Sequence, residues 1–132
     1  MINIFTDGAV EFKNPGRIGI GVVIYDNEKG IVKKYSRVGQ VQTSNFAEYV
    51  ALIVALEEAE KLGYKKISLY SDSQLMVRQI QGLYEVSHPN ILPLYKIAKS
   101  LLEEFEYTIQ HISRTENYVA DELSKQFTNG EW

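Results

Sequence analysis

The chain has 132 residues, of which 45% are hydrophobic and 23% are charged, and it contains no cysteine. This length and composition predict one globular domain over residues 1–132, and they argue against intrinsic disorder. The missing cysteines exclude a disulfide scaffold, a thiolate metal site and a cysteine nucleophile. The 14 basic and 17 acidic residues give a formal net charge of −3, so bulk charge does not predict a phosphate-rich partner.

Apolar segments of the chain are short. The longest one, residues 50–56, is far below the ~20 residues that a membrane-spanning helix needs. Residues 1–7 lack the basic segment of a secretory signal and already include an acid. We therefore expect a soluble cytoplasmic protein with no membrane contact. We also expect a monomer without an obligate protein partner.

The first forty residues have the pattern of three strands joined by turns. Strands are expected over residues 2–6, 18–25 and 31–38, which are rich in β-branched and apolar side chains. Asn14-Pro15-Gly16 and the segment 26–30 have the composition of turns. Short turns of this kind favour an antiparallel arrangement of these strands.

The rest of the chain alternates helical and strand patterns. Helices are expected over residues 46–62, 73–80, 91–105 and 117–125, and strands over residues 66–70 and 106–112. The order β-β-β-α-β-α-α-β-α predicts an α/β fold with a five-stranded mixed sheet. Three antiparallel strands are followed by two parallel ones, with helices on both faces. Short right-handed crossovers would make the first, fourth and fifth strands neighbours.

Four acids lie at the ends of these predicted elements. Asp7 follows the first strand and Asp72 follows the fourth. Glu48 is expected in the first turn of the first long helix, and Asp121 in the first turn of the last helix. Because sites in α/β sheets gather at the carboxyl ends of strands, the sequence predicts that these acids converge there.

Each acid alone also has a structural interpretation. Asp7 fits a tight turn, and Glu48 fits the partner of Asn45 in a capping box at a helix start. Asp72 fits a cap for the helix that follows it, and Asp121 fits a stabilising charge at a helix N-terminus. For three of the four acids, taken one at a time, the structural interpretation is the stronger one.

The four acids together favour a metal site. Two carboxylates about 4 Å apart repel by roughly 4 kcal/mol at an effective dielectric constant of 20. A cluster of four without a cation would therefore be unstable or would bind protons, and a divalent ion removes this difficulty. Oxygen ligands favour Mg²⁺ or Mn²⁺ over zinc, and a pair of such ions is an arrangement used for displacement at phosphorus.

Four segments that contain these acids resemble the motifs of type 1 ribonuclease H. In chain order they are Phe5-Thr6-Asp7-Gly8-Ala9 with Asn14-Pro15-Gly16 and Gly19-Ile20-Gly21, then Thr43-Ser44-Asn45-Phe46-Ala47-Glu48, then Tyr70-Ser71-Asp72-Ser73-Gln74, and finally residues 111–124. One such segment is weak, whereas four in register over residues 5–124 are highly specific. The resemblance implies a compact member of this family with a ribonuclease H-like fold.

This resemblance also implies an activity. It predicts a hydrolase, an endonuclease that cleaves the RNA strand of RNA–DNA hybrids and leaves 5′-phosphate and 3′-hydroxyl ends. Asp7, Glu48, Asp72 and Asp121 would be the catalytic ligands of two Mg²⁺ or Mn²⁺ ions. By analogy with the family, one ion would activate the attacking water and the other would stabilise the leaving 3′-oxygen.

Five further residues match positions that bind the nucleic acid in this family. Thr43, Ser44 and Asn45 match the stretch that contacts backbone phosphate and base edges. Asn14 and Gln74 match positions that reach the minor groove. Neutral amides suit this task because the 2′-hydroxyl and the groove shape distinguish RNA from DNA.

The sequence departs from better-known members in two ways. Residues 81–93 contain no lysine or arginine, whereas some members have a basic helix and loop there, so we expect weaker and more metal-dependent hybrid binding. His111 precedes Asp121 at the separation of a histidine that aids product release in many members. However, its expected strand position favours a structural role, and Arg114 is an alternative substrate-contacting residue. The roles of His111 and Arg114 stay open at this stage.

Two other functions compete with the ribonuclease H hypothesis. The chain could be a hybrid-binding module that kept the fold and lost turnover. The four acids argue against this alternative, and the missing basic segment argues mildly for it. The chain could also be a nuclease of the same superfamily that cleaves DNA, and nothing in its composition separates the two.

Overall fold

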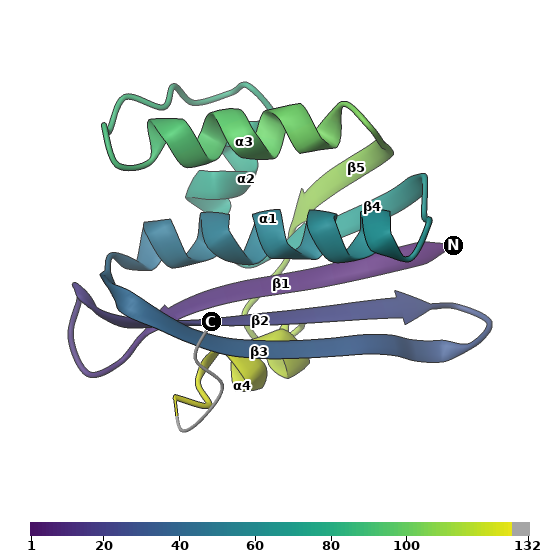
Figure 1. Cartoon of the computed structure of the whole chain (residues 1–132), viewed down its shortest axis with the longest axis horizontal. Coiled ribbons are helices and arrows are strands. Elements are labelled where there is room, and N and C mark those ends of the chain that lie inside the picture. The colour runs from purple at the N-terminus through teal and green to yellow at the C-terminus, as the bar shows by residue number, and fades with distance from the viewer. Residues whose placement is uncertain (128–132) are drawn as a thin grey trace.

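The computed structural model describes residues 1–127, which contain five strands and four helices. The strands are β1 (Ile2–Val10), β2 (Gly16–Asp26), β3 (Gly30–Gln42), β4 (Lys66–Ser71) and β5 (Glu106–His111). The helices are α1 (Ser44–Lys61), α2 (Gln74–Ile80), α3 (Leu92–Leu102) and α4 (Tyr118–Ser124). The predicted order of elements is confirmed, and Figure 1 shows them in place.

All five strands form one mixed sheet in the order β3-β2-β1-β4-β5. β1 pairs antiparallel with β2, and β2 pairs antiparallel with β3. β4 pairs parallel with both β1 and β5. The predicted fold class is therefore confirmed, including the neighbouring positions of the first, fourth and fifth strands.

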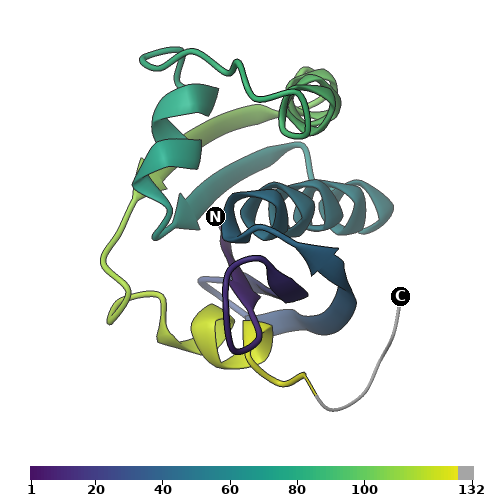
Figure 2. The same cartoon turned by 90° about the vertical axis from the view of Figure 1, so that its left-hand side faces the viewer.

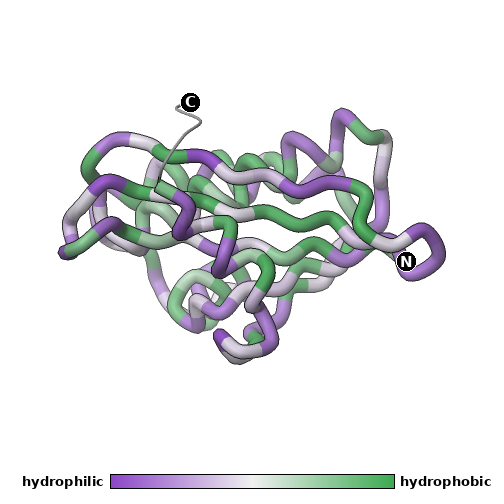
Figure 3. Tube along the Cα trace, turned by 90° about the horizontal axis from the view of Figure 1, so that it is seen from below, coloured by the Kyte–Doolittle hydropathy of each residue, from purple (hydrophilic) through white to green (hydrophobic). Residues whose placement is uncertain are grey.

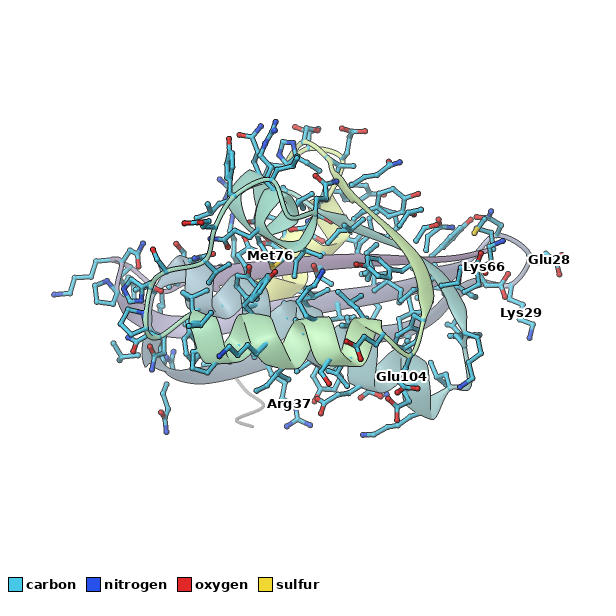
Figure 4. All side chains as sticks on the ribbon, turned by 90° about the horizontal axis from the view of Figure 1, so that it is seen from above. Glu28, Lys29, Arg37, Lys66, Met76 and Glu104 are labelled. Carbon is cyan, nitrogen blue, oxygen red and sulfur yellow. The ribbon has the colours of Figure 1, made fainter. Side chains whose placement is uncertain are left out.

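Helices cover both faces of this sheet, as predicted. α1 and α3 lie over one face and α4 lies on the other (Figure 2). The main core fills the space between the sheet and α1, α2 and α3. Met76 of α2 belongs to this core and lies in the interior, whereas charged residues such as Lys29 and Glu104 lie at the periphery (Figure 4). The turn between β2 and β3 is hydrophilic (Figure 3).

Two glycines of β2 set the distance between the sheet and α4. A Cβ atom at Gly19 would clash with the carbonyl oxygen of Ser124, and one at Gly21 would clash with the carbonyl oxygen of Ala120. Because neither residue has a side chain, the α4 backbone lies directly on the strand. In this arrangement the Ser124 hydroxyl of α4 reaches Asp7 of β1.

Several strands are longer than predicted. β1 continues past Thr6 to Val10, because Asp7 pairs with Gly21 and Val10 pairs with Ile18 across the hairpin. The turn interpretation of Asp7 is therefore wrong, and this acid lies within a strand. β2 and β3 extend beyond residues 18–25 and 31–38 for the same reason, since Gly16 pairs with Gln42 at one end and Asp26 pairs with Gly30 at the other.

The helix starts also differ from the prediction. α1 begins at Ser44, and Thr43 is its N-cap, with its hydroxyl accepting a hydrogen bond from the Phe46 N–H at 3.2 Å. The capping box of Asn45 and Glu48 is therefore wrong, and Glu48 lies beyond the first turn. Ser73, not Asp72, caps α2 by accepting a hydrogen bond from the Met76 N–H at 3.3 Å.

The remaining differences are small shifts at element ends. α3 is shorter than residues 91–105, α4 is shorter than residues 117–125, and β5 ends at His111. No helix within residues 1–127 is long and apolar enough to cross a lipid bilayer.

Candidate active site

The four acids meet at one cleft, although they come from four different elements. Asp7 lies in β1, Asp72 directly follows β4, and Asp121 lies in the first turn of α4. One carboxylate oxygen from each of these three residues lies within 4.8 Å of the others. Glu48 of α1 lines the same cleft, which has a volume of about 430 Å³. The predicted convergence is confirmed.

Asp7 and Glu48 form the inner part of the cleft, and we call them the inner carboxylates. Their residues are only 4% and 9% exposed. Glu48 Oε1 accepts a hydrogen bond from the Gly8 N–H at 2.9 Å, and Asp7 Oδ2 accepts one from the Ser124 hydroxyl at 2.7 Å. A Cβ atom at Gly8 would clash with the backbone of Ala47 and Glu48. Backbone contact between β1 and α1 therefore positions Glu48, and the hydroxyl of Ser124 in α4 positions Asp7.

Burial disfavours the charged forms of the inner carboxylates. It raises the pKa of Asp7 to about 8, and the hydrogen bond from Ser124 opposes this shift while the charge of Asp72 adds to it. Burial also raises the pKa of Glu48 well above its usual value. The charges of Asp7 and Asp72 add to that second shift, and the hydrogen bond from Gly8 opposes it.

Asp72 and Asp121 form the outer part of the cleft, and we call them the outer carboxylates. Both are more exposed than the inner pair. Asp121 Oδ1 lies 3.0 Å from Lys125 Nζ and 3.2 Å from Arg114 Nε. Both basic residues line the cleft, so this end of the site combines a carboxylate with two cations.

The geometry separates the two residues whose roles the sequence left open. Arg114 contacts Asp121 directly and lines the cleft. His111 is the last residue of β5 and pairs with Ser71, one residue before Asp72. His111 is exposed, which does not support the structural role favoured by its strand position.

Of the five residues predicted to bind nucleic acid, Ser44 lines the cleft, and Asn14 is bonded to it. Asn14 and Ser44 are joined by two hydrogen bonds, Asn14 Nδ2 to Ser44 Oγ at 3.1 Å and the Ser44 N–H to Asn14 Oδ1 at 3.2 Å. Thr43 caps the helix beside them. Asn45 Oδ1 is buried and lacks a hydrogen-bond partner within residues 1–127. Gln74 is exposed as the first residue of α2.

Sequence reasoning missed three residues that shape the site. Ser124 and Lys125 contact the acids from α4, at three and four positions after Asp121. Helical spacing could have identified both, since such residues share a helix face. Asn117 was missed as an anchor, and its Nδ2 donates to the Thr6 carbonyl oxygen at 2.8 Å. This bond ties the start of α4 to β1 beside Asp7.

The donor set suits a hard divalent cation. The three clustered groups offer carboxylate oxygens, which are the ligands that Mg²⁺ and Mn²⁺ prefer. A cation among them would also offset the mutual repulsion of the acids and the desolvation of Asp7.

Comparison with known proteins agrees with this geometry. Residues 5–127 match the family described as reverse transcriptase-like. The N-terminal ribonuclease H domain of Rv2228c from Mycobacterium tuberculosis superposes with a TM-score of 0.91 at 32% identity, over 97% of this chain and 98% of that one. The chain belongs to the ribonuclease H family. The ribonuclease H1 of Halobacterium salinarum is equally similar, with a TM-score of 0.90 and 35% identity over 95% of each chain.

The structure of a third relative of this ribonuclease H domain is a complex with nucleic acid. LC11-RNase H1 in complex with an RNA/DNA hybrid has a TM-score of 0.87 and 36% identity, over 93% of both chains. The full-length relatives are longer than this domain. The chain spans 31% of the bifunctional protein Rv2228c and 63% of the Halobacterium ribonuclease HI, with 35% identity to each.

Proposed function

We propose that this ribonuclease H domain is a metal-dependent endonuclease that hydrolyses the RNA strand of RNA–DNA hybrids. The observation that carries the proposal is the convergence of acids from β1, β4 and α4, with Glu48 in the same cleft. Membership of the family supports the substrate class, because one relative is described in complex with an RNA/DNA hybrid.

Asp7, Glu48, Asp72 and Asp121 would hold two divalent ions, Mg²⁺ or Mn²⁺. When bound, such ions lower the pKa of water and stabilise negative charge on phosphoryl oxygens. The inner carboxylates are held in place by Gly8 and Ser124 before any ion binds, so little reorganisation is required of them. Arg114 and Lys125 add positive charge at the outer side of the cleft, where the scissile phosphate would enter.

Hydrolysis would proceed by in-line displacement at phosphorus. The oxygen of a water molecule forms a bond to phosphorus, the bond from phosphorus to the ribose 3′-oxygen breaks, and that oxygen takes up a proton. The products carry a 5′-phosphate and a 3′-hydroxyl. The residues of this chain would orient the phosphate and exclude competing solvent at the buried side of the cleft.

Neutral side chains around the cleft would select the hybrid. Asn14 and Ser44 hold each other at the mouth, next to the Thr43 cap, and leave further hydrogen-bonding capacity for phosphate and sugar oxygens. The exposed amide of Gln74 is suited to groove atoms, including 2′-hydroxyl groups.

A cleavage assay tests the proposal. An RNA–DNA hybrid labelled at the RNA 5′ end is incubated with Mg²⁺, Mn²⁺ or EDTA. Wild type should cleave only with a metal, and Asp72→Asn should be slower by at least about 100-fold. Asp26→Asn is the matched control, because Asp26 lies at the far end of β2 and its replacement can still accept the Glu28 N–H. It should cleave like wild type.

Other outcomes would redirect the assignment. Binding of the hybrid in Ca²⁺ without cleavage in either Mg²⁺ or Mn²⁺ would identify a binding module. Equal cleavage of an all-DNA duplex would identify a DNA nuclease. Normal cleavage by a correctly folded Asp72→Asn variant, as judged by circular dichroism, would refute the assigned site.

A further inference from the structure

Phe12 lies in the turn between β1 and β2 with an unusual backbone and a fully exposed ring. Its φ angle is +66°, and within residues 1–127 it is the only residue other than glycine with a positive φ. Phe12 is 99% exposed, so its ring packs on no other side chain within residues 1–127. A large apolar side chain gains nothing for the fold in this position, and the positive φ disfavours it there.

Hydrogen bonds hold this strained backbone in place. The Lys13 N–H donates to the Glu11 carbonyl oxygen at 2.8 Å, which closes a tight turn centred on Phe12. The Glu11 N–H donates to the Arg17 carbonyl oxygen at 2.8 Å, and the Arg17 guanidinium binds both carboxylate oxygens of Glu11 at 3.0 and 2.8 Å. These bonds fix the backbone of the turn at Phe12, and its ring projects from there into solvent.

This turn lies between two parts of the candidate site. Val10, just before it, lines the cleft with the acids. Asn14, two residues after Phe12, is hydrogen-bonded to Ser44 at the start of α1. The turn and the start of α1 lie at the same end of the molecule (Figure 1). Phe12 is therefore only two residues in sequence from a residue of the cleft lining and two from Asn14.

We propose that Phe12 is a substrate-binding residue that packs against sugar rings in the minor groove of the bound hybrid, next to the nucleotides that Asn14 contacts. This inference rests on the proposed function. The minor groove of an A-like duplex is wide and shallow and presents sugar edges, and apolar side chains are used for contacts in minor grooves. An apolar contact here would add affinity in a chain whose segment 81–93 lacks basic residues.

Substitutions at position 12 separate this role from an effect on the turn. Phe12→Asn and Phe12→Gly remove the ring, and both residues tolerate a positive φ, so their melting temperatures should equal or exceed that of wild type. Phe12→Tyr keeps the ring. Leu62→Asn is the matched control, because Leu62 is an exposed apolar residue at the opposite end of α1.

Two measurements are compared for each variant. The Kd for the hybrid is measured by fluorescence anisotropy in Ca²⁺, and kcat and KM are measured in Mg²⁺. Phe12→Asn and Phe12→Gly should raise Kd and KM by about five- to tenfold with kcat within about twofold of wild type. Phe12→Tyr and Leu62→Asn should behave like wild type.

The results distinguish a failure of the role of Phe12 from a failure of the proposed function. If wild type cleaves the hybrid and the variants without the ring bind it equally well, the role of Phe12 is refuted and the proposed function stands. If wild type neither binds nor cleaves the hybrid, the proposed function fails, and the role of Phe12 fails with it.

Discussion

The inner and outer carboxylates of one cleft are held in different ways. Asp7 and Glu48 are buried. Asp7 accepts a hydrogen bond from the buried hydroxyl of Ser124, and Glu48 accepts one from the Gly8 N–H. The outer acid Asp121 is instead paired with the long side chains of Arg114 and Lys125. Hydrogen bonds between packed elements thus position the two buried carboxylates, whose charged forms are disfavoured by burial. The long side chains of Arg114 and Lys125 instead neutralise Asp121, which lies nearer to solvent.

This difference suggests a division of roles. The inner pair depends on close backbone packing, so changes that disturb this packing should damage both stability and activity. Of the outer pair, Asp121 would exchange its side-chain cations for a metal ion, so changes at this ion pair should alter metal affinity and leave the fold intact. Three predictions test this division, in order of decreasing effect.

The largest effect, a combined loss of stability and activity, is expected from Gly21→Ala. The new Cβ would clash with the carbonyl oxygen of Ala120 and crowd Leu123, so α4 must move away from β2 and carry Asp121 with it. We expect a loss of about 3 kcal/mol or more in the free energy of unfolding and a fall in kcat/KM of about 100-fold. Urea unfolding and hybrid cleavage measure the two quantities.

Gly63→Asn is the control for this substitution. Among the described residues, 1–127, no atom lies within 4 Å of a Cβ placed at Gly63, and asparagine tolerates its φ angle of +82°. Its activity should match wild type. Full activity of Gly21→Ala would show that the contact between β2 and α4 does not position the site.

The second prediction concerns the pH dependence of metal-free stability. Because the pKa of Asp7 rises from 3.8 to about 8 on folding, the folded protein binds more protons than the unfolded chain between these pH values. Stability from this group is therefore fully present below pH 4 and is lost as the pH rises towards 8. The raised pKa of Glu48 acts in the same direction.

Asp7→Asn removes the contribution of Asp7 and keeps an acceptor for the Ser124 hydroxyl. In EDTA at pH 7 the variant should be more stable than wild type by up to roughly 4 kcal/mol, and the difference should shrink towards pH 4. Urea unfolding across this pH range measures it. A difference that is independent of pH would contradict the raised pKa of Asp7.

The smallest effect is expected from Lys125→Gln. This change removes a cation that competes with a metal ion for Asp121. Because exposed ion pairs contribute little, we expect only a two- to fivefold tighter binding of Mn²⁺ by isothermal titration calorimetry, with an unchanged melting temperature. Lys66→Gln, at the distant start of β4, is the control. Weaker Mn²⁺ binding by Lys125→Gln would mean that the lysine assists the metal.

Much of this arrangement is predictable from sequence because it depends on local patterns. The β-branched runs and helical periodicity give the order of elements, and the position of Asp72 after a strand follows from them. The length of β1 was not predictable in the same way. Asp7-Gly8 has the composition of a turn, but pairing of Val10 with Ile18 on β2 extends the strand through it.

The contacts that hold the site are tertiary and therefore escape sequence patterns. Glu48 has the spacing of a capping-box residue from Asn45, yet its carboxylate accepts from Gly8 instead, forty residues earlier in the chain. The bond from Ser124 to Asp7 joins nearly opposite ends of the chain. Such contacts depend on the packing of α1 and α4 on β1.

Anomalous diffraction from crystals grown with Mn²⁺ tests most directly whether inner and outer carboxylates share a metal. We predict an anomalous peak within bonding distance of Asp7 and Asp72 oxygens, with Lys125 displaced from Asp121. Absence of a peak among these carboxylates at saturating Mn²⁺, with the ion pair of Lys125 and Asp121 intact, would contradict the metal site on which the proposed activity depends.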